Sequence, residues 1–352
     1  MDNSYFIFTD SSLNLEIERF HICTWEFKNG SALMEIGCEI SSENLSNDLE
    51  YIETEIFIPW LNHQNDCNDL FPQLKDPINA KFIFNDSVIN THSFDGGRGL
   101  LGVLHEFQVR EPLCFLPVAI EPDYDSKKIK AKLDLTTYRN KEANSNIYFR
   151  FSVTANIDFL SIRKKGVTRS TIIYDLKINE GRNLPDSLFA ELQKKQLCSI
   201  KHCFCFTIVP NSYDLTFFDS SSLKNVRTLE YDAFNRYLTS RLVQENQLMV
   251  VFNKKKFPDS FAFFSIFTKE RIGAGQFALA ILVNLISGIL LFLPGYREKN
   301  NNSFFSKIFW LNLPIEVYIA ILIGFALITY FIWPKLVSIF YSLKRNEASK
   351  KN

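Results

Sequence analysis

Two long apolar segments near the C-terminus constrain this 352-residue chain more than any other feature of its sequence. Residues 272–293 contain no Asp, Glu, Lys or Arg, and residues 315–334 contain only Glu316. A helix that crosses the hydrocarbon core of a bilayer, about 30 Å thick, needs roughly 20 such residues. Because a water-soluble domain cannot easily bury two such segments, the sequence predicts a transmembrane hairpin at residues 271–343, with spans 272–293 and 315–334.

Charge is distributed unevenly along the chain, although the total is zero. Residues 254–352 carry 13 Lys and Arg against 5 Asp and Glu, a net charge of +8, so the residues before them carry −8. Nonspecific binding to nucleic acid requires clustered Lys and Arg that displace phosphate counterions. The acidic balance of the first 253 residues therefore argues against that class of function.

Basic residues predict the orientation of the hairpin. Five flank the first span on its N-terminal side, five follow the second span, and the connector holds three: Lys254, Lys255, Lys256, Lys269 and Arg271; Lys335, Lys344, Arg345, Lys350 and Lys351; Arg297, Lys299 and Lys307. The positive-inside bias places both termini, including a basic tail at 344–352, in the cytoplasm. The first residues lack a basic segment followed by an apolar core, so no secretory signal is expected. Seven cysteines in that compartment are expected to stay reduced.

The first 270 residues are predicted to be mainly β. Residues 1–165 contain short apolar runs between polar turns, including one at 80–89, and Ile129, Ala131, Leu133 and Leu135 alternate with polar residues. This pattern favours a cytosolic β-sandwich or jelly-roll-like domain. Residues 166–270 are interpreted as a mixed continuation or a second small domain with helices at 185–196 and 229–243. In the latter Phe234, Leu238 and Leu242 recur every four residues. One continuous sandwich is the alternative.

Several sequence patterns in the β-rich part could carry chemistry, but each favours a structural interpretation. Gly97, Gly99 and Gly102 match a dinucleotide-binding fingerprint without the strand and helix that should flank it. Cys198, His202, Cys203 and Cys205 lack the spacing of a zinc site, and the three cysteines are expected to be buried thiols on a strand. Glu121, Asp123 and Asp125 lack the glycine and terminal glutamate of a calcium loop and are expected to form a solvated turn. No histidine (His21, His63, His92, His105) lies in a recognisable nucleophile setting.

The first apolar span carries a polar stripe. At 100° per residue, its small and polar residues fall on one face: Gly273, Gln276, Ala280, Asn284, Ser287 and Gly288. In the second span Ala320 and Gly324 form a pair of small residues four apart. Such residues let helices approach closely, whereas polar side chains in lipid mark functional positions. Two interpretations stay open: the stripe joins the two helices, or it contacts sister subunits and lines a pore or defect.

The order of parts resembles the two-transmembrane effectors of bacterial anti-phage defence systems, including those paired with retron reverse transcriptases. The resemblance lies in a β-rich cytosolic module followed by IGAGQFALAILVNLISGILLFL, a connector, IEVYIAILIGFALITYFIW and a short basic tail. It implies an inner-membrane protein that is silent in a complex with a protein or ribonucleoprotein partner, such as a reverse transcriptase complex, and damages the bilayer when released.

The sequence thus favours a non-enzymatic effector that works as a homo-oligomer in the inner membrane, without catalytic residues, cofactor or metal. A membrane-anchored binding or scaffold protein with a passive hairpin is the alternative. An anchored enzyme whose site is invisible in the spacing of residues is a third interpretation.

Overall fold

A computed structural model describes residues 3–13, 15–27, 30–45, 49–95, 100–139, 145–238, 243–255, 260–300, 313–329 and 332–333. The chain divides into two compact units. The β unit consists of Met1–Lys165 and Ser170–Lys269, and the helical unit consists of Gly166–Arg169 and Glu270–Asn352. The predicted tail at 344–352, connector residues 301–312, Gly97, Gly99 and Leu242 lie outside the described residues.

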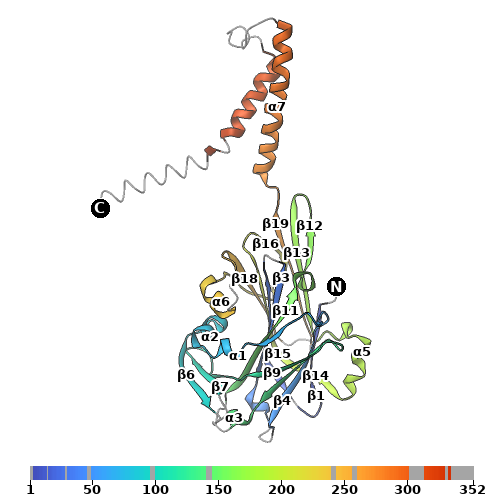
Figure 1. Ribbon diagram of the computed structural model, residues 1–352, viewed down its shortest axis with the longest axis vertical. Helices are drawn as coiled ribbons and strands as arrows, with labels where there is room; N and C mark the ends of the chain where they lie inside the picture. Colours follow the sequence, from blue (N-terminus) through green and yellow to red (C-terminus); the bar gives the residue numbers. More distant parts are fainter. Residues whose placement is uncertain are drawn as a thin grey trace, which may run out of the picture. The chain divides into compact units, whose positions relative to one another are not determined.

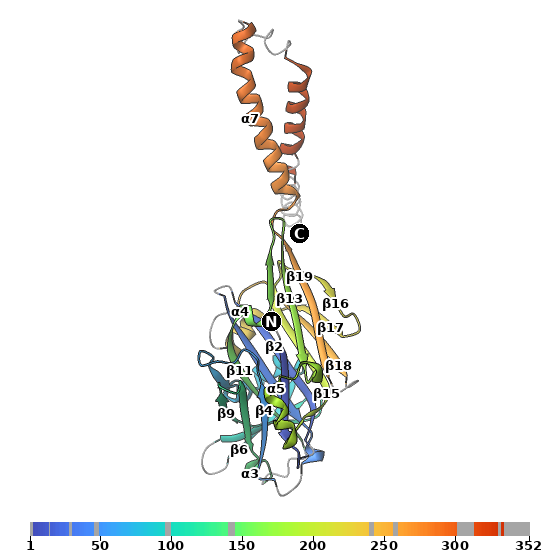
Figure 2. The same ribbon diagram turned by 90° about the vertical axis from the view of Figure 1, so that its right-hand side faces the viewer.

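The β unit contains two large sheets (Figures 1 and 2). The nine-stranded sheet has the order β16 (Asp214–Phe218), β19 (Phe261–Glu270), β13 (Arg169–Ile178), β1 (Ser4–Asp10), β4 (Tyr51–Phe57), β10 (Lys128–Asp134) and β9 (Val118–Asp123), with β12 (Ile162–Lys165) on β13 and β14 (Lys195–Leu197) on β1. The ten-stranded sheet has the order β17 (Leu223–Thr228), β18 (Gln247–Lys255), β15 (Ser199–Pro210), β2 (Glu16–Glu26), β3 (Ser31–Ile40), β11 (Asn146–Asn156), β8 (Leu113–Phe115), β7 (Leu100–Phe107) and β6 (Val88–Asp95), with β5 (Cys67–Asp69) on β11.

Both sheets are mixed. Strand β1 pairs in parallel with β13, β2 with β15, and β8 with β11, while antiparallel pairs include β2 with β3, β10 with β4, and β15 with β18. The jelly-roll form of the prediction, in which strands are antiparallel, is therefore not what forms. The expected boundary between residues 165 and 166 falls at the turn between β12 and β13, and strands from both sides of it share both sheets.

The two sheets share one hydrophobic core. Ile7 of β1 and Leu176 of β13 belong to the same cluster as Ile22 of β2 and Phe149 of β11, and all four are inaccessible or nearly so. The alternation predicted for β10 is confirmed, because Ile129, Ala131, Leu133 and the following Leu135 are all fully buried while the residues between them are not. Period-two side-chain alternation thus supplies the inner face of this sandwich.

Short helices cover the outer faces of both sheets. On the ten-stranded sheet lie α1 (Phe71–Leu74), α2 (Pro77–Phe84) and α6 (Tyr231–Leu238), and α5 (Asp186–Phe189) lies on the nine-stranded sheet (Figure 1). The remaining short elements are α3 (Thr136–Arg139), α4 (Ile157–Leu160), and the 3₁₀ turns η1 (Ser42–Asn44), η2 (Gly181–Asn183) and η3 (Glu191–Gln193). Because these helices bury outer-face side chains, the sandwich has three hydrophobic layers rather than one.

Two local predictions differ from the structure. The strand expected at 80–89 is wrong for its first half, which forms the end of α2. Asp76 caps that helix by accepting a hydrogen bond from the Ile78 amide at 2.9 Å, Pro77 occupies its first turn, and Asn85 ends it in the left-handed conformation. The helix predicted at 185–196 shortens to α5 and η3 and passes into β14. The helix at 229–243 is confirmed over α6.

The helical unit contains α7 (Ala274–Asn300) and a second apolar helix, Ile315–Thr329. Leu313 and Val317 pack against Leu293 and Tyr296. Residues 275–296 of α7 are long and apolar enough to cross a membrane, whereas the 15 described residues of the second helix are fewer than a full span requires.

Position 37 in β3 requires glycine because the Tyr148 side chain packs closely against the backbone there. A Cβ atom at this position would overlap the Tyr148 hydroxyl and would lie 2.9 Å from Tyr148 Cζ. By contrast, a Cβ atom on Gly181 of η2 would meet nothing within 4 Å.

We therefore expect Gly37→Ala to lower the unfolding free energy of residues 1–270, expressed alone, by about 1–3 kcal/mol, the usual cost of overpacking. Gly181→Ala is the matched control and should change it by less than about 0.5 kcal/mol. Urea unfolding followed by circular dichroism measures both. Equal effects of the two substitutions would contradict the close approach seen at Gly37.

Candidate functional site

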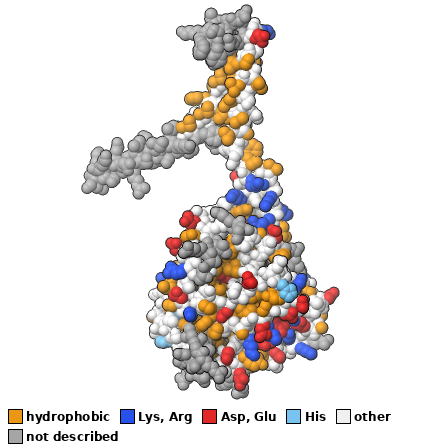
Figure 3. Space-filling model, viewed as in Figure 1, with side chains coloured by type: hydrophobic (Ala, Val, Ile, Leu, Met, Phe, Trp, Pro, Cys, Tyr) orange, Lys and Arg blue, Asp and Glu red, His pale blue; other side chains and the backbone are white. Residues whose placement is uncertain are grey.

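The apolar surface of α7 is the most unusual surface of the chain. None of its candidate membrane span, Gly275–Tyr296, is buried by the rest of the protein. Exposed large side chains include Phe277, Leu290 and Leu291, the last with 82% of its surface accessible. Figure 3 shows many hydrophobic side chains at the surface of the helical unit. A core helix of a soluble protein would have a covered face, so the exposure favours a lipid environment for α7.

The predicted polar stripe lies on the exposed side of α7. Gln276, Ala280, Asn284, Ser287 and Gly288 are all exposed. The half-buried positions of α7 instead carry small or apolar residues: Gly275, Ala278, Leu282, Leu285, Ile289, Leu293 and Tyr296. Among the described residues, no hydrogen bond joins Asn284 or Ser287 to the second helix. The role of this stripe, either joining the two helices or contacting sister subunits, stays a prediction.

The small pair of the second helix lies on its covered face. Ala320 and Gly324 are half-buried, in line with the buried Val317. A Cβ atom on Gly324 would lie 3.8 Å from Leu282 Cδ1, which places this glycine against α7. The structure therefore brings Ala320 and Gly324 to the face that contacts α7, where small residues permit close packing, and leaves the five stripe residues of α7 outside it.

Gln276 has a second role at the start of α7. Its Oε1 accepts a hydrogen bond from the backbone amide of Gly273, three residues earlier. This is the reciprocal contact of a capping box, in which a Gln or Glu in the first turn satisfies a free backbone donor. The helix begins directly after Gly273, three residues beyond the end of β19 at Glu270.

The cysteine-rich strand packs thiols into the core, as predicted. Cys203 and Cys205 point into the shared core with Cys198 nearby in the same cluster, whereas His202 lies on the other side of β15. Burial raises the pKa of Cys205 to about 12, so its thiol stays protonated. Within the described residues, no group of three His, Cys, Asp or Glu side chains could hold a metal ion.

The other candidate motifs are structural. Gly102 lies inside strand β7, which β8 follows without an intervening helix. Asp123 accepts hydrogen bonds from the amide and hydroxyl of Ser126, and these lower its carboxyl pKa in the exposed turn between β9 and β10. His105 is buried between the Thr91 hydroxyl and a backbone carbonyl.

A pocket of about 420 Å³ in the β unit has a buried carboxylate in its lining. Glu26 accepts a hydrogen bond from the Ser161 hydroxyl at 2.6 Å and pairs with the Arg163 guanidinium. Burial raises the pKa of Glu26, and the charge of Arg163 opposes this shift. Because both partners belong to the protein, the carboxylate is already satisfied.

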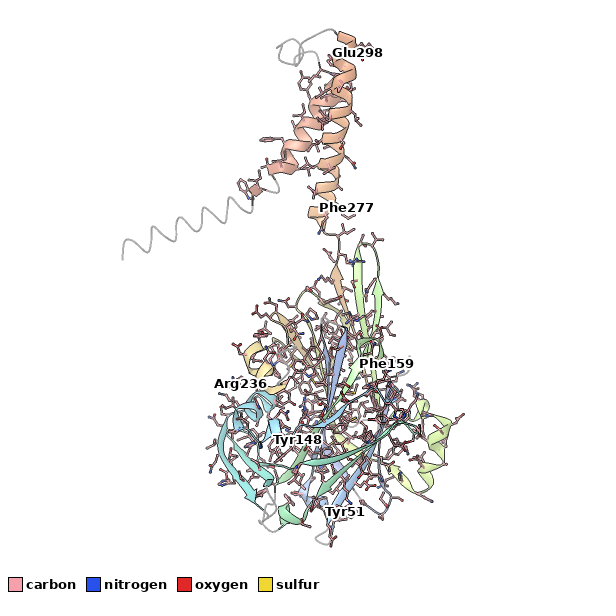
Figure 4. All side chains as sticks on the ribbon, in the orientation of Figure 1. Tyr51, Tyr148, Phe159, Arg236, Phe277 and Glu298 are labelled. Carbon is pink, nitrogen blue, oxygen red and sulfur yellow. The ribbon has the colours of Figure 1, made fainter. Side chains whose placement is uncertain are left out.

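The main feature that sequence reasoning missed is a buried ion pair on the outer face of the ten-stranded sheet. Glu35 of β3 is fully buried and binds the Arg150 guanidinium of β11. It also accepts hydrogen bonds from Trp25 Nε1 at 3.2 Å and from the Tyr237 hydroxyl of α6 at 3.3 Å. A hydrogen bond of 3.0 Å joins the Tyr148 hydroxyl to His21 Nδ1. Figure 4 shows Tyr148 inside the packed β unit.

Electrostatics make this network a structural element rather than an acid–base site. Burial, together with the charge of Arg150, lowers the pKa of His21 well below its usual value, so the ring is neutral at pH 7. Burial raises the pKa of Tyr148 to about 12, although Arg150 opposes the shift. The His21 ring and the Tyr148 hydroxyl are therefore uncharged near neutral pH, and the Tyr237 hydroxyl joins α6 to the sheet.

We expect Arg150→Met to destabilise residues 1–270 by about 3–5 kcal/mol, because the Glu35 carboxylate would be left buried without its partner. Arg182→Met removes an exposed ion pair with Glu180 and should leave the urea midpoint unchanged within error. Chemical unfolding of both variants is the measurement. A small effect of Arg150→Met would mean that the network does not hold α6 in place.

Comparisons with known proteins do not define a family. No family model matches the chain, and no curated protein matches it. Among solved structures, it is similar to that of a putative protease from Parabacteroides distasonis ATCC 8503, with a TM-score of 0.30 and 10% sequence identity over 82% of this chain and 47% of that one. The chain thus corresponds to about half of that protein, and a similarity this low carries no inference about fold or activity.

Proposed function

We propose that this protein is an inner-membrane effector whose β unit binds a partner and whose apolar helices disrupt the bilayer when the partner releases them. The observation that supports this most directly is the polar stripe of α7, which is exposed on a helix whose surface is otherwise suited to lipid. A passive anchor has no need for such a stripe, whereas a pore or defect requires polar groups within the membrane.

Placing the polar stripe in lipid costs free energy, and this cost favours association between copies of the chain. A polar side chain near the middle of a membrane helix is unfavourable unless it meets another polar group or water. Asn284 and Ser287 are not covered by the second helix in the described structure, so sister copies of α7 are the nearest source of such groups. Interhelical hydrogen bonds of this kind contribute about 0.6–2 kcal/mol each, enough to bias assembly.

The β unit is the part of the chain that we propose binds a macromolecular partner. Its cysteines other than Cys67 are buried, and short helices pack against the outer faces of both sheets. In the resembling anti-phage effectors the cytosolic module is bound by a protein or ribonucleoprotein, and we propose the same arrangement here. Membrane damage on release would then kill an infected cell.

Both termini should be cytoplasmic if the second apolar segment also spans. A cysteine introduced at Asn301 should react with an impermeant thiol reagent in whole cells, and one at Lys350 should react only after permeabilisation, because basic flanks stay inside. The native thiols give little background, since all but Cys67 are buried. Labelling at 350 but not at 301 would overturn this topology.

The activity of the stripe can be separated from anchoring. Overproduced without its partner, the protein should depolarise the inner membrane, and Asn284→Leu with Ser287→Ala should abolish depolarisation while preserving insertion, because apolar residues favour the membrane. Leu290→Ile, which keeps an exposed aliphatic position aliphatic, is the control. A potential-sensitive dye and membrane fractionation report the two properties.

A wild-type protein that accumulates in the membrane without depolarising it would favour the passive tether. Equal depolarisation by the wild type and the double variant would place the disruptive element outside the stripe.

A further inference from the structure

The turn between β12 and β13 is fixed to the residues that precede α7. The Arg271 amide donates a hydrogen bond to the Thr168 carbonyl at 2.8 Å, and Arg271 Nη1 donates to the Gly166 carbonyl at 2.9 Å. The Gly166 amide closes the turn by donating to the Arg169 carbonyl at 2.9 Å. Turn and helix start belong to the same unit, so the position of the turn relative to the start of α7 is set by these bonds.

This attachment limits how far the turn can lie from the membrane. Arg271 precedes Gly275, the first residue of the candidate span, by four residues, a path of at most roughly 14 Å even when fully extended. The headgroup layer on each side of the hydrocarbon core is roughly 5–8 Å thick. If α7 spans, the turn is therefore held at the depth of the headgroups or immediately beside them.

The side chains of the turn fit that location. Val167, at the tip, is 79% exposed, and Arg169 and Arg271 are exposed beside it. Lys164 and Lys165 precede the turn in sequence, and Glu270 is the single acidic residue adjacent to Arg271. An exposed apolar residue among cations is the composition of protein segments that bind anionic membrane surfaces.

We propose that the turn Gly166–Arg169, together with Arg271, binds the headgroups of anionic phospholipids, with Val167 placed among them and the two guanidinium groups pairing with phosphates. The inference rests on the proposed insertion of α7. The turn would then be a second membrane contact beside α7 and would fix the orientation of the chain where it leaves the bilayer. The strength of this contact would depend on the charge of the lipid headgroups.

The test uses the full chain with a single fluorophore. A Val167→Cys variant is labelled with an environment-sensitive dye and reconstituted into vesicles of phosphatidylcholine alone or mixed with phosphatidylglycerol. Val109→Cys is the matched control, since Val109 is 88% exposed in the loop that follows β7. Labelling at neutral pH is selective because six native thiols are buried and burial raises the pKa of Cys67 to about 11.

We expect the dye at 167 to shift to the blue and to be quenched by headgroup-labelled lipid in anionic vesicles, with the effect weakened by salt. The dye at 109 should do neither. Adding Arg169→Gln to the labelled variant should reduce the fraction of turns bound to anionic headgroups about fivefold when that fraction is small. This is the effect expected for the loss of one basic residue at an anionic surface.

Each other result overturns the proposal. If the protein floats with the vesicles but the dye at 167 behaves like the dye at 109, the turn does not touch the membrane although α7 does. Equal quenching in zwitterionic vesicles, without salt dependence, excludes the recognition of anionic lipid. Failure of the unlabelled chain to float with either vesicle contradicts the proposed insertion itself, and this inference falls with it.

Discussion

The parallel pairing of β15 with β2 is the contact on which the β unit depends. It runs from Ser199 opposite Glu16 to Ile208 opposite Trp25 and inserts a strand from the second half of the chain beside one from the first. Together with the parallel pairing of β1 and β13, it makes both sheets from both halves. Neither half could bury its inner face alone, because Cys205 and Val250 fill the same core as Ile22 and Ile36. Such long-range pairing costs chain entropy before it yields contacts, so we expect this unit to fold slowly and as one cooperative body.

The outer face of the ten-stranded sheet is organised by a charge rather than by apolar packing alone. Glu35 and Arg150 lie on neighbouring strands, and their burial is tolerated because Trp25 and Tyr237 satisfy further lone pairs of the carboxylate. A buried pair is seldom worth more than apolar residues of equal size, but it is intolerant of partial loss. The network therefore specifies where α6 docks, since only Tyr237 placed over Glu35 completes it.

Period-two alternation predicted the sandwich because one face of each strand fills the core, as for Ile129, Ala131 and Leu133. The rule gave no sign that Glu35 is buried, because helices far away in the sequence cover its face of the strand. The strand expected at 80–84 was an apolar run whose helical signals, Asp76 and Pro77, lie before it. Parallel pairing was unpredictable, since it depends on contacts between distant residues rather than on any local pattern. In α7 the helical periodicity predicted one face for the polar residues, but periodicity cannot tell which face a neighbouring helix covers.

The exposed surface of α7 decides what environment the helical unit requires. Among its described side chains, eight large apolar residues are exposed: Phe277, Leu279, Ile281, Val283, Ile286, Leu290, Leu291 and Phe292. Burying each more fully is worth on the order of 1 kcal/mol, so their exposure to water would cost on the order of 10 kcal/mol. That sum is comparable to the entire folding free energy of a typical domain. Lipid removes this cost for the aliphatic face but not for Asn284 and Ser287, which gain nothing from hydrocarbon. The apolar and polar parts of the α7 surface therefore demand different neighbours, which is the physical basis for our proposal of a bilayer that contains more than one copy of the chain.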